Sequence, residues 1–188
     1  FTSTRLLRIA IATMGLTVSA AVWVKLGFTG ALMVVVTLLI VFLFGLVFCR
    51  YVLGLSDALS LLISAGTAIC GASAIAAVGP ALKAKPEEMG LSVCAITLFG
   101  LLAMFGYPLA FDGFLAGYLE HNPQAFGMWA GTGIHETAQV IAAASQVDAA
   151  LSIATSSKFI RIFMIGPMVI ICLLIYRALS SDAAKGQV

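Results

Sequence analysis

Long stretches without any charged residue are the feature that most constrains how this chain can fold. Residues 27–49 contain no Lys, Arg, Asp or Glu, and neither do residues 58–82. A helix needs about 20 residues to cross the roughly 30 Å hydrocarbon core of a bilayer, so each stretch is long enough to span it. Only 10% of the 188 residues are charged and 62% are apolar, whereas soluble domains are roughly 25% charged. The sequence therefore predicts an integral membrane protein and excludes a soluble globule.

The distribution of charges predicts one all-α membrane domain over residues 1–188, a polytopic helical bundle of about six transmembrane helices. The expected spans are residues 6–24, 27–49, 58–82, 89–111, 123–146 and 151–176, followed by a polar tail or linker at residues 177–188. If every helix crosses fully, five cations lie on one side and three on the other, a small excess that favours the first side as cytoplasmic. On that side would lie Arg5, Arg8, Arg50, Arg177 and Lys185, and on the other Lys25, Lys83 and Lys85. A re-entrant third helix, the alternative, would invert everything after it.

Two of the expected helices share the pattern Ala-Gly-Thr-x-Ile near their middle. It occurs at residues 65–69 and again at residues 130–134. Glycine costs about 1 kcal/mol relative to alanine inside a helix, so the cluster indicates either close helix contact or a break. A broken helix offers free N–H groups and a positive dipole end to an anion, as discontinuous transporter helices do. We expect an interruption between Gly66 and Gly71, with small-residue packing and no break as the alternative.

Polar side chains in the fifth and sixth expected helices are candidates for function, since hydrocarbon does not tolerate them unpaired. A zincin site is not indicated, because Gln139 stands four residues after His135, where that motif needs a second histidine. Glu136 or His135 can exchange a proton with the substrate pathway. Alternatively, Glu136 only pairs with Lys158 or Arg161, within whose reach we expect it. These two cations share a helix face and can also clamp an oxyanion.

Other kinds of chemistry are not indicated. The net charge of +2 and the absence of basic tracts argue against a nucleic-acid partner. The four cysteines lack metal-ligand spacing, and neither a metal, a cofactor nor enzymatic activity is expected. Pro86 and its charged neighbours, residues 83–88, predict a solvated turn that binds nothing. The chain starts without methionine or a signal-peptide pattern, so we expect a processed product or an internal piece of a longer protein.

Several strings of residues carry a resemblance to a known family. They are residues 64–75 (Ser-Ala-Gly-Thr-Ala-Ile-Cys-Gly-Ala-Ser-Ala-Ile), 83–86, 98–100, 103–104, 107–108 and 131–140, with Lys158 and Arg161. Over residues 5–176 the chain resembles the YeiH-like sulfate exporter family of bacterial inner-membrane proteins. That family is similar to the bile acid and sodium symporter superfamily, which implies inverted repeats with broken helices crossing at the substrate site. Its members are longer, with helices on both sides of the present piece.

The resemblance and the residues together predict a transporter of the bacterial inner membrane that exports a small anion by alternating access, with proton coupling as an option. Sulfate, a related oxyanion or a sulfonate is the expected substrate. The expected substrate-binding residues are Gly66, Thr67, Cys70, Gly71, Ser73, Thr132, Gln139, Lys158 and Arg161, and the expected coupling residues are His135 and Glu136. Expected partners are the anion and the lipid bilayer, with homo-oligomerisation left open. A passive anion channel and a non-transporting membrane scaffold are the alternatives.

Overall fold

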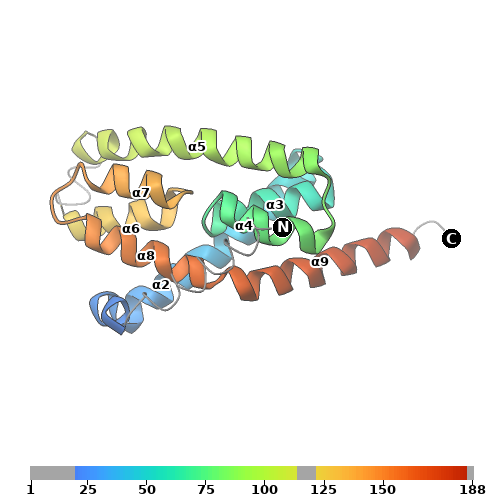
Figure 1. Cartoon of the computed structure of the whole chain (residues 1–188), viewed down its shortest axis with the longest axis horizontal. Helices are drawn as coiled ribbons and strands as arrows, with labels where there is room; N and C mark the ends of the chain where they lie inside the picture. The colour runs from blue at the N-terminus through green and yellow to red at the C-terminus, as the bar shows by residue number, and fades with distance from the viewer. Residues whose placement is uncertain (1–19, 114–121, 186–188) are drawn as a thin grey trace, which may run out of the picture.

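The computed structural model describes residues 20–113 and 122–185, and the elements it forms there are all helical. The first expected span, residues 6–24, lies almost wholly outside these residues. Figure 1 shows the arrangement of the helices. In chain order they are α2 (Ala20–Val47), the π-helix η1 (Phe48–Val52), α3 (Asp57–Ala68), α4 (Ala72–Leu82), α5 (Pro86–Asp112), α6 (Pro123–Gly133), α7 (Thr137–Ala144), α8 (Leu151–Phe163) and α9 (Ile165–Lys185). The all-α class is confirmed, and α9 includes most of the expected polar tail.

Within the described residues, two helices are long and apolar enough to cross a bilayer. They are Gly27–Val52, which joins most of α2 to η1, and Pro86–Asp112, which is α5. Helices α8 and α9 make a third span if they are taken together across the 45° bend between them. Proline fits the first turn of α5 because the N–H that Pro86 lacks has no helical partner at that position. The described residues, which hold five of the six expected spans, thus contain two or three candidate spans by length and composition.

The third expected helix is two helices that turn back on each other. Helix α3 ends at Ala68 and α4 begins at Ala72, so the predicted interruption between Gly66 and Gly71 is confirmed. Gly71 precedes α4 with a φ of 70°, a conformation that L-residues rarely adopt. The Ser56 hydroxyl before α3 donates a 2.5 Å hydrogen bond to Glu88 at the start of α5. The beginning of α3 and the end of α4 therefore lie at the same end of the molecule.

The favoured expectation of a crossing helix at residues 58–82 is not met, because a crossing helix would separate its two ends by its whole length. Residues 58–82 instead form a re-entrant hairpin, which was the alternative expectation.

The fifth expected helix, residues 123–146, is also divided. Helix α6 ends at Gly133 and α7 begins at Thr137. Phe126 in the first turns of α6 and Ala144 at the end of α7 belong to one buried cluster, so this segment also forms a hairpin.

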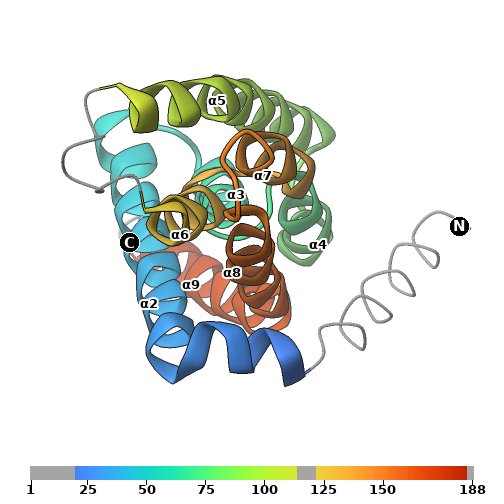
Figure 2. The same ribbon diagram turned by 90° about the vertical axis from the view of Figure 1, so that its left-hand side faces the viewer.

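The two hairpins meet tip to tip alongside α5, which runs the length of both (Figure 1). In Figure 2 the α6–α7 hairpin lies in front of the α3–α4 hairpin. A Cβ atom added to Gly71 would lie 2.8 Å from Cγ of Glu136, so the tips approach closely. Ile96, in the middle of α5, packs on the first tip and accepts a 3.0 Å hydrogen bond from His135 in the second. The meeting point is therefore at mid-length of α5.

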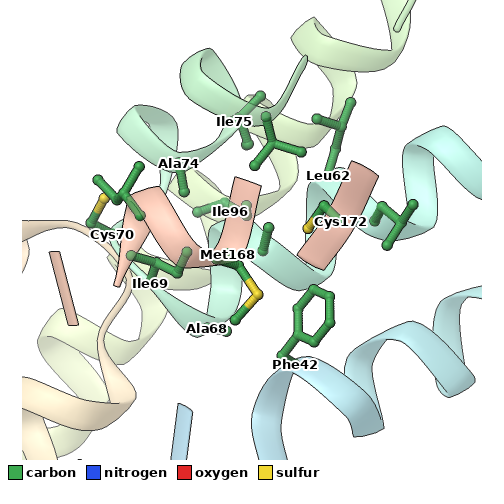
Figure 3. Packing of buried hydrophobic residues seen from close by; sticks show 14 of the residues in the cluster. Phe42, Leu62, Ala68, Ile69, Cys70, Ala74, Ile75, Ile96, Met168 and Cys172 are labelled. Atoms are coloured by element: carbon green, nitrogen blue, oxygen red, sulfur yellow. The ribbon is translucent and has the colours of Figure 1, made fainter. Parts of the chain in front are cut away.

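The apolar core surrounds the first hairpin. Phe42 of α2, Leu62 of α3, Ile75 of α4, Ile96 of α5 and Met168 of α9 are all buried in one cluster (Figure 3). The outer faces of α2 and α5 are instead apolar and exposed, as expected for helices that contact lipid tails. The core thus fixes the first hairpin inside the bundle.

Candidate functional site

A cavity of about 270 Å³ lies between the two hairpin tips. Its walls are the first turn of α4, the first turn of α7 and the bend between α8 and α9. The lining residues are Cys70, Ala72, Ser73, Glu136, Thr137, Ala138, Ile162 and Ile165. The first N–H groups of a helix have no partner within it, and its N-terminus carries roughly half a positive charge. Two such ends converge on this cavity.

The N-terminus of α4 is the less occupied of the two ends. Gly71, the residue that precedes α4, has no side chain with which to cap it. Sγ of Cys70 lies within hydrogen-bonding reach of the Ser73 hydroxyl and of the Ala74 N–H. A thiol is a weak acceptor, so it leaves this end open to a stronger one. The first turn of α4 is accordingly suited to bind an anion.

The N-terminus of α7 already has a carboxylate. Glu136 precedes the helix and forms a reciprocal capping pair with Gln139: each side chain accepts from the other's backbone N–H. The Thr97 hydroxyl of α5 donates a further 3.2 Å hydrogen bond to Glu136 Oε1. Glu136 is half-buried and lines the cavity. One carboxyl group of the protein itself therefore stands at the edge of the candidate site.

Arg161 of α8 holds the C-terminal ends of both half-helices. Its Nε and Nη2 donate to the carbonyls of Ala68 (2.7 Å) and Thr67 (2.6 Å) at the end of α3. Its Nη1 donates to the carbonyls of Gly131 (3.2 Å) and Thr132 at the end of α6. Thr67 and Thr132 hold the same place in the repeated Ala-Gly-Thr-x-Ile pattern. Arg161 is only 2% exposed and joins the two motifs to each other.

Lys158, one turn before Arg161, has a similar role at the second tip alone. Its Nζ donates to the carbonyls of Ile134, at 2.8 Å, and His135, and the residue is completely buried. Cations stabilise the C-terminal ends of helices, where the dipole is negative. Among the described residues no salt bridge joins Glu136 to Lys158 or Arg161. The expected ion pair is thus replaced by hydrogen bonds from both cations to carbonyls.

Helix α5 supports the second tip from outside the cavity. His135 Nδ1 donates to the Ile96 carbonyl, and Gln139 Nε2 donates to the Thr97 carbonyl at 3.3 Å. A carbonyl only accepts, so His135 Nδ1 must carry a proton. Gly100 leaves the space that the Gln139 side chain fills. His135 and Gln139 therefore position the tip rather than line the cavity.

The predicted site residues fall into three groups. Cys70, Ser73 and Glu136 line the cavity, and Gly71 lies directly beside it. Lys158 and Arg161 bind carbonyls behind the tips, as do the positioning residues His135 and Gln139. The remaining three do not line the cavity: Gly66 packs on Ile96 of α5, the Thr67 carbonyl accepts a hydrogen bond from Arg161, and the Thr132 hydroxyl donates to the Met128 carbonyl within α6.

Sequence reasoning missed five residues that line the cavity, of which Ala72 stands between the predicted residues Gly71 and Ser73. Thr137 and Ala138 could have been found from the sequence. When the two motifs are aligned, these residues correspond to Ala72 and Ser73 of the first tip. Extending the shared pattern by four residues would have found them. Nothing in the sequence distinguishes Ile162 and Ile165, since they are apolar residues of an apolar segment. Their place in the cavity wall comes from the bend between α8 and α9.

Comparisons with known proteins match the chain along its whole length. A family model described as "Conserved hypothetical protein 698" matches residues 1–187. A UPF0324 membrane protein of Bordetella bronchiseptica is 37% identical over 188 residues, which cover 100% of this chain and 58% of that protein. The UPF0324 inner membrane protein YeiH of Escherichia coli is 33% identical over 172 residues, or 91% of this chain and 48% of that protein. The chain thus spans about half the length of these relatives. No solved structure matches it.

Proposed function

The chain belongs to the UPF0324 family of membrane proteins, described as conserved hypothetical protein 698, and we propose that it forms part of a transporter that moves a small anion across the bacterial inner membrane. The name of the Escherichia coli relative supports that membrane as the location. The observation that carries the proposal is the cavity at which the N-termini of α4 and α7 meet. Half-helix N-termini directed at a site in mid-membrane are the means by which transporters bind anionic groups.

The charges around the cavity support an anion rather than a cation as cargo. Lys158 and Arg161 bind the negative C-terminal ends of α3 and α6, which keeps those ends from opposing an anion. The positive ends remain directed at the cavity, which Ser73 and Thr137 also line. An anion in the cavity can accept hydrogen bonds from N–H and O–H donors while Lys158 and Arg161 keep their hydrogen bonds to carbonyls.

The arrangement of the hairpins supports alternating access. They extend inward from opposite ends of the molecule, so each separates the cavity from one end (Figure 1). The same Ala-Gly-Thr-x-Ile pattern ends the first helix of each, and Arg161 contacts both patterns. This correspondence between elements that enter from opposite sides is what an inverted repeat would produce. In the proposed mechanism one hairpin moves at a time, and the cavity opens to one side and then the other.

The orientation follows from the cations outside the cavity region. Among the described side chains, these gather at the end where α3 and α5 begin: Arg50 bonds Asp57 there, and Lys83, Lys85 and the end of α9 surround a second cavity of about 400 Å³. Cytoplasmic loops are richer in Lys and Arg, so we assign this end to the cytoplasm. Whatever the orientation of the protein, an inside-negative potential favours anion export by about 2.3 kcal/mol per charge at 100 mV.

Flux into liposomes that contain the full-length protein tests this proposal. A carrier should exchange labelled anion for unlabelled anion across the membrane and accumulate the label transiently, because its site faces one side at a time. A passive channel would conduct without such exchange, and a scaffold would give no flux for any anion in the panel. If Glu136 couples protons, Glu136→Gln should remove flux driven by a pH gradient, since an amide cannot exchange a proton near neutral pH. Glu87→Gln, a change at an exposed carboxylate of α5, is the matched control.

A further inference from the structure

The second cavity, of about 400 Å³, lies at the end of the molecule where α3 and α5 begin. We propose that it binds the headgroup of an anionic phospholipid, whose phosphate is held by Lys83 and Lys85. The sequence predicted that the turn at residues 83–88 binds nothing, but the structure places this turn in the wall of a cavity that α3, α5 and α9 also line. The inference does not depend on the proposed transport, because the length of the first hairpin separates this cavity from the one between the tips.

The surface around the second cavity changes from apolar to polar at the level of the cavity itself. On α5, Glu88 lines the cavity, and Leu91, one turn further along the helix, is 57% exposed. On α9, Leu174 is 60% exposed, Tyr176 lines the cavity, and the next residue, Arg177, is charged and exposed. Exposed apolar side chains of a membrane protein contact lipid tails, and tyrosine is enriched where the tails meet the headgroups. The cavity therefore lies at the height of the headgroups of one leaflet.

Both carboxylates that line the second cavity are already bound by the protein. Asp57 forms a 3.1 Å ion pair with Arg50. Glu88 accepts a 2.5 Å hydrogen bond from the Ser56 hydroxyl and a 3.1 Å hydrogen bond from the backbone N–H of Lys85. A cationic group of a ligand would have to compete with these partners, so the carboxylates do not make this a cation site.

The two lysines of the second cavity are not bound in this way. Lys83 and Lys85 are both exposed, and within the described part of the chain neither forms a salt bridge. Exposed lysines are charged at neutral pH. When Arg50 is included, three cations stand against the two carboxylates, which leaves an excess of one positive charge. This excess matches the one negative charge of a lipid phosphodiester.

The surroundings favour an anionic lipid over two related ligands. The ammonium group of phosphatidylethanolamine would lie near the lysines and would find both carboxylates occupied. Phosphatidylglycerol offers the same phosphodiester with an uncharged glycerol instead. A soluble phosphodiester would gain the same contacts with Lys83 and Lys85, but it would leave the apolar surface at Leu91 and Leu174 without the acyl chains that a lipid supplies. We therefore assign the cavity to a phospholipid of the phosphatidylglycerol type.

Native mass spectrometry of the purified full-length protein in a non-ionic detergent tests this assignment, because it resolves the binding of single lipids. The probes are phosphatidylglycerol and phosphatidylethanolamine with the same acyl chains, and glycerophosphoglycerol, the soluble headgroup of the first. We expect phosphatidylglycerol to bind at least about fivefold more tightly than phosphatidylethanolamine, which is roughly the contribution of one lysine beside an anionic lipid. Glycerophosphoglycerol should bind much more weakly, since it lacks acyl chains. Equal binding of the two lipids, or equal binding of the lipid and its soluble headgroup, would overturn the proposal.

Single substitutions locate the site. Lys83→Gln and Lys85→Gln should each weaken phosphatidylglycerol binding about fivefold and leave phosphatidylethanolamine binding unchanged. Both lysines are exposed, so each variant should keep the wild-type melting temperature in lipid-free detergent. Arg177→Gln is the matched control, because it removes an exposed cation of α9 that does not line the cavity. Equal losses in all three variants would show a general attraction between cations and anionic lipid, and no loss in either lysine variant would show that the lipid binds elsewhere; both results refute the proposed site.

Discussion

Replacement of Arg161 by glutamine should destabilise the protein more than the loss of any exposed charge. The guanidinium donates hydrogen bonds to carbonyls of Thr67, Ala68, Gly131 and Thr132, and the residue is 2% exposed. A hydrogen bond to a charged group contributes about 1.5–3 kcal/mol, but bonds that share one side chain are not additive. Removal of the guanidinium also leaves buried carbonyls without a donor, at about 1–3 kcal/mol for each group that finds no other partner, so we expect a total loss of at least about 3 kcal/mol. Lysine at this position keeps the charge but not the planar fork, so its effect should be intermediate.

Thermal unfolding of purified Arg161→Gln, with hydrogen exchange of the tip segments, measures this effect. Exchange should increase at residues 66–71 and 131–136 together, because one side chain holds both. Arg50→Gln is the matched control: Arg50 forms a 3.1 Å ion pair with Asp57 whose partners are 26% and 31% exposed, so its loss should cost about 0–1 kcal/mol. If Arg161→Gln keeps wild-type stability but loses anion binding, the arginine is a substrate ligand and the structural argument is refuted.

Three further predictions test the turn, the tip and the topology. Replacement of both Lys83 and Lys85 by glutamine should leave flux nearly unchanged and stability within about 1 kcal/mol, since both are exposed; a large loss of substrate affinity would show a binding site there. Gly71→Ala should destabilise the protein and reduce anion binding, because the φ of Gly71 is 70° and Glu136 fills the space that the new Cβ would need. Gly90→Ala, the control, has no atom near the new Cβ and should be neutral or stabilising, so equal melting temperatures of the two variants would contradict this prediction. In a background without native cysteines, a cysteine at Lys83 should react with an impermeant maleimide only in inside-out vesicles, and one at Asp148 only in intact cells; the reverse pattern would invert the orientation.

The amino-acid sequence was sufficient to predict the helical class, the membrane environment and the break in the first hairpin. These follow from local properties: long uncharged runs require a bilayer, and the glycines at positions 66 and 71 disfavour a continuous helix. The repeated Ala-Gly-Thr-x-Ile pattern also indicated that residues 65–69 and 130–134 have related roles. Each of these features depends on neighbours in the chain, so a single sequence contains the information.

The direction of the chain after each break was decided only by the tertiary structure. A broken helix that crosses and a hairpin that turns back have the same composition, so hydropathy cannot distinguish residues 58–82 in one form from the other. The distinction arises from packing at the ends, such as the Ser56–Glu88 hydrogen bond between residues far apart in the chain. The roles of Lys158 and Arg161 were hidden for a related reason. Every residue has a carbonyl, so a sequence does not identify which carbonyls a buried cation binds until the fold brings the helix ends together.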